Sequence, residues 1–428
     1  MNQQEQTHTL DNGLTILTKE IHHVPLVSHW IWYRIGSRNE VAGNTGISHW
    51  VEHMQFKGTP KYPINVLDQA ISRDGGFWNA MTSLDWTTYL ETLPAHKLDI
   101  ALELEADRMI NSSFDPHETE LERTVVISER EGNENEPLFR LSEAVNTLGF
   151  KEHPYRNQVI GFRKDLETIT REQLYGHYKQ HYSPNNAVIA LAGDFDTQDV
   201  LTRIEELYGN IPAQENNTFI PQPEGALDDF QRVDLEGPGD TLYMQISYRS
   251  PAASDPDFFA LMVLDSLLTG PSSLDMFGGG SISNKTSRLY RLLVEQDKAV
   301  NISGGLQATV DPYLYDMLAI LPPGQSEAQV LQVIDDEIKS LQDSPVPTED
   351  IQRAIKQAKA LFAYGSENTT NQAFWLGYSA MFADPSWFER YIPNLEQVDA
   401  GRLMQAARKY LNSEQRIVGI YHPKESSK

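Results

Sequence analysis

The sequence predicts a protein of mixed α-helical and β-strand structure in two related parts, and three observations support this. The chain has 428 residues, more than one hydrophobic core usually organises, so we expect two to three domains. Segments with strand-like and helix-like patterns alternate along it. A polar stretch rich in Pro, Gly and Asn, near residues 213–228, divides the chain almost in half and predicts a linker.

In the first half, runs of apolar and β-branched residues between turn residues predict strands, and apolar residues at helical spacing predict helices. The turn Asp11-Asn-Gly13 precedes the first strand, the pair Gly75-Gly76 ends a short helix, and Pro137 stops a long one. The predicted strands are 14–17, 26–35, 77–90 with a turn near 83–85, and 187–192, and the predicted helices are 46–58, 66–73, 98–109, 118–136 and 173–181.

The second half repeats part of the first. The helix–strand segment that starts near Leu166 resembles the one near Leu395, and Val188 and Ile417 lie at matching places in the two strands. Both pairs are 229 residues apart. We interpret this as an internal duplication. The predicted organisation is an N-terminal domain over 1–215, a linker over 216–228 and a homologous C-terminal domain over 229–428.

Composition narrows the possible partners and metal ligands. The chain has 35 Lys and Arg against 60 Asp and Glu, a formal net charge of −25, so we expect neither nucleic acid nor an anionic membrane surface as a partner. No apolar run approaches the ~20 residues of a membrane span. Cysteine is absent, which excludes disulfides, thiolate metal sites and cysteine nucleophiles. Any metal must be held by His, Asp or Glu.

The N-terminal residues give one expectation about the compartment. They are polar and lack the apolar stretch of a signal peptide. We therefore expect a cytoplasmic protein, with a periplasmic protein whose leader has been removed as the alternative.

The segment His49-Trp-Val-Glu52-His53 carries the clearest chemistry. Histidines at positions i and i+4 lie on one face of a helix, one turn apart, and Glu52 lies beside that face. Two imidazoles can bind one Zn²⁺ while the carboxylate faces the reacting water. With 12 histidines in the chain, chance produces this pattern only ~0.05 times. The alternative is a pair of solvated histidines on a surface helix, which the intervening Trp-Val disfavours.

A catalytic zinc also needs a third protein ligand, and His, Asp and Glu all remain possible. The acidic helix predicted over 118–136 offers Glu122 and Glu129, which are seven residues apart and therefore share one face. Apolar neighbours on that face indicate that at least one of the two points inward. The alternative, a charged helix exposed to solvent, fits Glu131, Glu134 and Glu136 better.

These motifs together resemble the pitrilysin/insulinase family of inverzincin peptidases, which includes the mitochondrial processing peptidase. The resemblance lies in the inverted motif and its continuation over 49–60, in 75–89, in 101–109 and in His153-Pro-Tyr-Arg, and it is densest between residues 10 and 195. It implies an α+β fold of two homologous domains, each a largely antiparallel sheet with helices packed on one side. It also implies a zinc endopeptidase that cleaves peptides or unfolded segments inside a closed chamber.

The resemblance also assigns roles to residues. A glutamate 76 residues after the second histidine completes the family's metal site, which implies that His49, His53 and Glu129 hold one Zn²⁺ per chain. Glu122 matches a glutamate that supports a ligand. Glu52 would be the base that takes a proton from the attacking water. The strand that carries Asn79 and Ala80 would bind the substrate as an added strand.

One departure from the family predicts a partner. Active members carry an Arg and a Tyr seven residues apart in the second half, and the aligned positions here are Val294 and Asn301. A shift in register would enlist Arg288 or Arg291, which we disfavour. We therefore expect a heterodimer with a homologous zinc-free subunit that supplies the Arg/Tyr pair, and weak activity for this chain alone.

Two alternative functions share some of these sequence features. The first is a non-catalytic assembly or binding subunit of the same family, which the intact set of His49, Glu52, His53 and Glu129 argues against. The second is a different zinc hydrolase with the inverted motif, such as the ribosylhomocysteine lyase that makes an autoinducer. That enzyme is much shorter and needs a cysteine, which this chain lacks.

Overall fold

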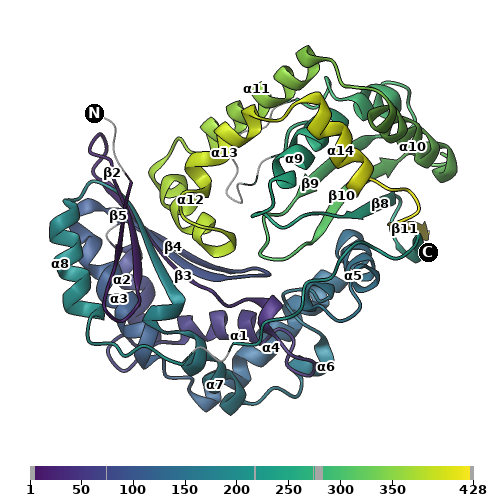
Figure 1. Cartoon of the computed structure of the whole chain (residues 1–428). Helices are drawn as coiled ribbons and strands as arrows, with labels where there is room; N and C mark the ends of the chain where they lie inside the picture. Colours follow the sequence, from purple (N-terminus) through teal and green to yellow (C-terminus); the bar gives the residue numbers. More distant parts are fainter. Residues whose placement is uncertain (1–4, 74, 216–217, 273, 275–282, 425–428) are drawn as a thin grey trace. The chain divides into compact units, whose positions relative to one another are not determined.

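The computed structural model describes residues 5–73, 75–215, 218–272, 274 and 283–424, and Figure 1 shows its helices and strands. The chain forms two compact units, each with one β-sheet. Unit 1 comprises residues 1–131, 157–221 and 366–388, and unit 2 comprises 132–156, 222–365 and 389–428. The crossing at residues 221 and 222 lies inside the predicted linker, of which residues 216 and 217 are outside the described part.

The sheet of unit 1 has six strands in the order β1-β2-β6-β3-β5-β4. Strands β2 and β6 run parallel and every other neighbouring pair is antiparallel. All strands predicted in the first half are confirmed. The bounds are β1 Gln6–Thr9, β2 Thr15–Glu20, β3 Leu26–Tyr33, β4 Phe77–Thr82, β5 Thr87–Pro94 and β6 Ala187–Gly193.

The sheet of unit 2 has five strands in the order β7-β11-β8-β10-β9, again with one parallel pair, β7 and β11. This order repeats β2-β6-β3-β5-β4 strand for strand. Val188 pairs with Trp32 of β3, and Ile417 pairs with Ser247 of β8, so the two positions matched from the sequence hold equivalent places. The duplicated topology is therefore present. The bounds are β7 Gln231–Pro238, β8 Leu242–Arg249, β9 Asn301–Leu306, β10 Leu314–Leu321 and β11 Arg416–Lys424.

Helices from the first half cover one face of the sheet in unit 1, and the other face receives a helix from far along the chain. On β3, Tyr33 stacks with Tyr182 after α7, whereas Trp30 and Trp32 pack against Phe374 of α12. Gly377 of α12 allows this approach, because a Cβ there would lie 2.0 Å from Nε1 of Trp32. The helices are α1 Ile47–Met54, α2 Ile64–Ser72, α3 Leu98–Asn111, α4 Pro116–Glu134, α6 Arg163–Leu166, α7 Arg171–His181, α8 Thr197–Tyr208 and α12 Thr369–Phe382.

Unit 2 shows the reciprocal arrangement. Helix α5, which follows α4 in the first half, packs against β11, β7 and β8. Gly419 of β11 admits it, since a Cβ there would lie 2.6 Å from Val145. A division at residues 216–228 assigns α5 and α12 to the opposite units from those in which they pack. The helices of unit 2 are α5 Pro137–Gly149, α9 Asp257–Leu268, α10 Glu327–Asp343, α11 Thr348–Gly365, α13 Trp387–Glu396, which begins in unit 1, and α14 Ala400–Tyr410.

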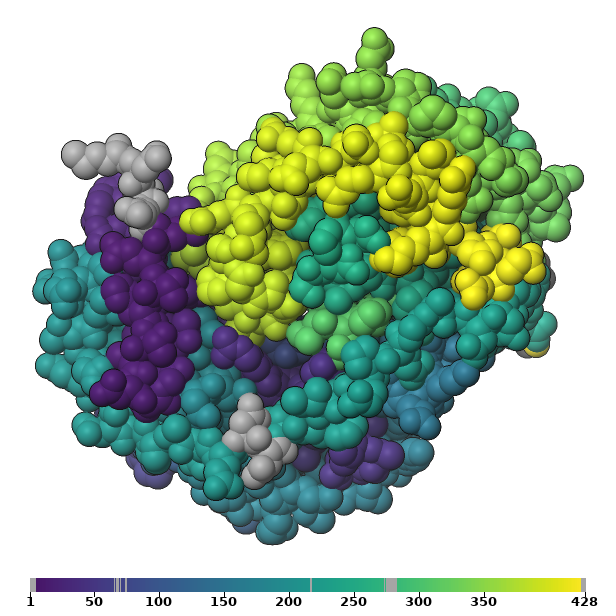
Figure 2. All heavy atoms as spheres, viewed as in Figure 1, coloured from purple at the N-terminus to yellow at the C-terminus, as the bar shows by residue number. Residues whose placement is uncertain are grey.

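The C-terminal helices, coloured yellow, lie at the surface of the face shown in Figure 2.

Within the described residues, no helix combines the length and apolar character that a membrane crossing needs.

Candidate active site

Helix α1 places the histidine motif on the sheet of unit 1. It begins after Gly46, whose φ of +85° favours glycine, and the buried carboxylate of Glu40 accepts hydrogen bonds from the backbone N–H groups of Gly46 and Ser48 at 2.8 and 2.9 Å. Trp50 is fully buried, so one face of α1 is fixed in the core. The helix is therefore held at its start and along its length, which fixes the direction of the motif.

The two histidines and Glu129 converge as the resemblance implies. Nε2 of His49 lies 3.8 Å from Oε1 of Glu129, and Nε2 of His53 lies 3.6 Å from Oε2. One donor atom from each residue lies within 4.8 Å of the others. Glu129 comes from α4, so the site joins two helices that are distant in sequence.

Glu122 fixes the ring of His53. Its Oε1 accepts a hydrogen bond of 2.8 Å from Nδ1 of His53, and Lys57 pairs with its other oxygen. With the proton on Nδ1, Nε2 keeps its lone pair and faces Glu129. Burial lowers the pKa of His53, but the hydrogen bond to Glu122 and the nearby carboxylates outweigh burial, so the pKa is raised. Of the two candidate ligands on α4, Glu122 is buried and Glu129 is exposed.

Glu52 lies buried beside the histidines and is held by a residue from another element. Oγ1 of Thr82, the last residue of β4, donates a 2.5 Å hydrogen bond to Oε2 of Glu52. Burial raises the pKa of Glu52 to about 7, although this hydrogen bond lowers it. A carboxyl group with a pKa near neutrality is suited to accept and release a proton.

The donor set fits a zinc ion. Zn²⁺ prefers neutral imidazole nitrogens and carboxylate oxygens. Burial, with a smaller effect of His53, lowers the pKa of His49 to about 3, which keeps that ring uncharged. The side chain of Glu129 is 43% exposed, so the site is open to solvent, as a catalytic centre requires.

Asn79 and Ala80 lie on β4, which forms the outer edge of its sheet. Ala80 pairs with Tyr89 and Asn79 with Leu90, both on β5, and within the part of the chain that the structure describes β4 pairs with no other strand. Asn79 is exposed and Ala80 is buried. A free edge can accept an added strand.

The positions that depart from the family lie in unit 2. Val294 ends a short π-helical turn over Tyr290–Val294, and Asn301 begins β9. Arg288 forms ion pairs with Glu337 at 2.7 Å and Asp350 at 3.7 Å. Its guanidinium is therefore already engaged, which disfavours Arg288 as the substitute, whereas Arg291 is exposed.

A second group of metal-type side chains lies in unit 2 but is held together by an arginine. Asp234, Glu327 and His422 each offer one atom within 4.8 Å of the others. Arg232 donates to Asp234 at 2.7 Å and to Glu327 at 3.0 Å. The cluster is thus a charge-paired network on the surface.

Comparison with known proteins identifies a family for this chain. The sequence profile described as insulinase (peptidase family M16) matches residues 15–162, and that described as peptidase M16 inactive domain matches residues 168–358. The chain belongs to the peptidase M16 family. The resemblance identified from the motifs is thereby confirmed, and the first M16 profile ends at residue 162 while the second begins at residue 168.

Named relatives and a solved structure extend this likeness. An uncharacterized zinc protease of Mycobacterium leprae is 26% identical over 98% of this chain and 92% of its own length. A probable mitochondrial-processing peptidase subunit beta of Arabidopsis thaliana is 28% identical over 66% of this chain and 53% of its own. The crystal structure of a protease from Helicobacter pylori, at 23% identity, superposes with a TM-score of 0.89 and covers 98% of this chain and 99% of its own. It supports the fold.

Proposed function

We propose that this M16 chain is a zinc-dependent endopeptidase that cleaves peptides or unfolded segments. The observation that carries the proposal is the convergence of His49, His53 and Glu129 with the buried Glu52 beside them. The first three residues would hold the ion, and Glu122 would orient His53. When bound, Zn²⁺ supplies Lewis-acid polarisation of the scissile carbonyl and of the attacking water.

The side chains of this chain would then perform the proton transfers. Oε2 of Glu52 is engaged by Thr82, which leaves Oε1 to take the proton from water and deliver it to the leaving amine. A peptide lying along β4 would be held through its backbone, so its side chains would be recognised only loosely. Asn79 and Ala80 are the β4 residues assigned to this contact.

The active form is proposed to include a homologous zinc-free subunit. Neither Val294 nor Asn301 has a guanidinium group that could bind a substrate carbonyl or carboxylate. A probable mitochondrial-processing peptidase subunit beta is among the relatives, and its name describes one subunit of a larger assembly. The partner would contribute the missing Arg/Tyr pair.

The test is hydrolysis of a quenched fluorescent peptide by the purified chain, alone and with a homologue that lacks the histidine pair but carries the Arg/Tyr pair. Metal content is determined on the same samples. One zinc per chain and strong activity only in the mixture is the expected result. Full activity of the chain alone would contradict the split site, and bound metal without activity in either sample would contradict the peptidase proposal.

A further inference from the structure

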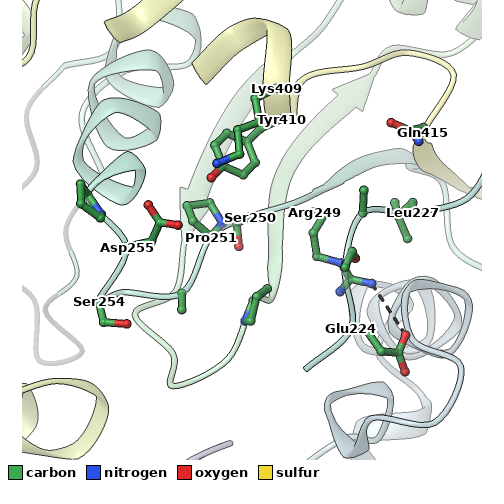
Figure 3. Close-up of a pocket in the computed structure, with 15 residues that line it drawn as sticks. Glu224, Leu227, Arg249, Ser250, Pro251, Ser254, Asp255, Lys409, Tyr410 and Gln415 are labelled. Atoms are coloured by element: carbon green, nitrogen blue, oxygen red, sulfur yellow. Dashed lines mark hydrogen bonds and ion pairs between the residues drawn. The ribbon is translucent and has the colours of Figure 1, made fainter. Parts of the chain in front are cut away.

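A cavity of about 460 Å³ is formed entirely by residues of unit 2, whereas the histidine pair belongs to unit 1. Its volume lies in the range of small-molecule sites, ~300–1,000 Å³. Three prolines and Leu227 give it apolar walls. In Figure 3, Arg249 and Glu224 lie together at one end, and Lys409 and Tyr410 lie at another. The prolines are Pro251, Pro256 and Pro312.

Arg249, the last residue of β8, is a buried cation with an unused donor. Only 7% of the residue is exposed. Its Nε donates to the carbonyl oxygen of Gly225 at 2.8 Å and its Nη2 to that of Gly149 at 2.5 Å, while the ring of Phe150 lies 4.2 Å from the guanidinium carbon. Nη1 is buried and has no hydrogen-bond partner within the described residues. A buried donor left unpaired costs free energy, so an acceptor from a ligand would stabilise it.

Glu224 compensates this charge only in part. It lies 4.0 Å from Arg249, beyond hydrogen-bond distance. Its two oxygens instead accept three backbone N–H bonds, from Lys151 at 3.0 Å and from Glu152 and His153 at 2.8 Å. Burial lowers the pKa of Arg249 to about 10, with Glu224 acting in the opposite direction, as expected for a cation that lacks a close counter-ion.

The other charged groups around the cavity are already paired. Lys409 and Tyr410 both donate to Asp257, at 2.7 and 3.0 Å. Asp255 accepts the backbone N–H of Asp257 at 2.8 Å at the start of α9. Of the two cations described around this cavity, Lys409 meets its carboxylate at 2.7 Å and Arg249 only at 4.0 Å, so Arg249 is the less fully compensated of the two.

We propose that this cavity binds a carboxylate attached to a small apolar group. The apolar group would pack against the prolines and Leu227, and the carboxylate would accept hydrogen bonds from Arg249, whose planar fork suits a carboxylate. Because Nη1 is shielded from solvent in this structure, binding of the ligand would require the Arg249 side chain to move. Free organic acids and the C-terminus of a peptide offer this same chemistry. The proposal does not depend on the peptidase activity.

Binding is tested by isothermal titration calorimetry on the full chain carrying Glu52→Gln, which prevents turnover of any peptide. The probes are 3-phenylpropanoate and its uncharged amide. We expect the acid to bind at least 10-fold more tightly than the amide, as loss of a charge-assisted hydrogen bond predicts. Equal affinities, or no heat of binding for the acid at millimolar concentration, would overturn the proposal.

Two variants locate the binding. Arg249→Lys keeps the charge but loses the fork, and Ala252→Leu fills the cavity without removing a polar group. Each should weaken binding of the acid at least 10-fold. Ala328→Leu, an exposed position on α10, is the matched control and should leave binding unchanged. If Arg249→Lys fails to fold, Ala252→Leu decides alone, and unchanged binding in it would refute the assignment to this cavity.

A second pair of probes identifies the source of the carboxylate. A hexapeptide ending in Phe is used with a free C-terminus and with an amidated one, in the Glu52→Gln chain with and without Ala252→Leu. If Ala252→Leu weakens the binding of the peptide with the free C-terminus but not that of the amidated peptide, the site recognises peptide C-termini. If neither peptide responds but 3-phenylpropanoate does, it recognises free acids, and if none of the probes responds the proposal fails.

Discussion

The two units share one strand order, yet the helix that follows the central strand differs completely between them. In unit 1, β3 leads to α1, which carries two partly buried histidines, with side chains 14% and 21% exposed, and a buried glutamate beside them. In unit 2, β8 leads to α9, in which every residue from Phe258 to Leu268 is buried. A helix buried on all sides cannot present ligands to solvent. The duplicated scaffold therefore permits a metal centre but does not specify one.

The units also differ in the side chains that can serve as probes of their unfolding. All seven tryptophans of the chain lie in unit 1. So do four histidines whose pKa values burial lowers, namely His29, His49, His177 and His181. Tryptophan fluorescence therefore follows unit 1, whereas circular dichroism follows both units. This allows the comparison to be tested in each unit separately.

The largest effect is expected from Glu52→Gln in unit 1. The glutamine retains the shape but cannot take the proton, so kcat should fall about 1,000-fold, on the order of 4 kcal/mol. Zinc content, measured by mass spectrometry on the same sample, should not change, because the three proposed ligands remain. Loss of the metal together with activity would contradict the assignment of Glu52 as the base.

In unit 2 the corresponding test is Leu264→Ala on α9, where Leu264 is fully buried. The cavity left behind should lower the free energy of unfolding by about 2–5 kcal/mol. Urea titration followed by circular dichroism measures this. Peptidase activity and zinc content should be unchanged in native buffer. The matched control is Leu292→Ala, at a residue 38% exposed, which should change stability little.

That comparison fails if the Leu264→Ala chain folds but loses its zinc, since α9 would then serve the metal site as well as its own core. The comparison is strengthened if the urea midpoint followed by tryptophan fluorescence is unchanged while the midpoint followed by circular dichroism falls.

Acid should weaken unit 1 through its buried histidines. Burial lowers the pKa of His181 from 6.5 to about 4. As the pH falls from about 6.5 to about 4, His181 becomes protonated in the unfolded chain but stays neutral in the folded chain. The free energy of unfolding therefore decreases, by about 3 kcal/mol in total from this residue. His181→Gln should remove that share of the pH dependence. The measurement is tryptophan fluorescence in urea at about pH 7 and about pH 4.

The control for this titration is His117→Gln, because His117 is exposed in the same unit. Its pH dependence should match that of the parent chain. An unchanged slope in His181→Gln would mean that this ring does not stay neutral in the folded state.

The sequence predicted local features well and long-range pairings poorly. The i, i+4 histidines and the strand and helix patterns are local, and all of those described in the first half are present. The helix pattern made both Glu122 and Glu129 candidates for the third ligand, and only the family resemblance chose Glu129, because nothing local marks a ligand 76 residues away. Helices α5 and α12 were not among the predicted elements, and nothing local in their sequences says on which sheet each of them packs. Thr82 and Lys57 were missed because their partners, Glu52 and Glu122, come from other segments of the chain.

Thr82 gives the smallest effect and tests whether the edge strand of unit 1 also orients the base. Thr82→Val keeps the shape but removes the hydroxyl that donates to Glu52. Losing one hydrogen bond to a carboxylate costs about 1.5 kcal/mol, so kcat should fall about 10-fold. KM and zinc content should not change, because the backbone of β4 and the ligands are untouched. Thr82→Ser, which retains the hydroxyl, should restore most of the rate. If both variants are equally slow, the loss arises from packing at the end of β4, and Glu52 is positioned by the core of α1 alone.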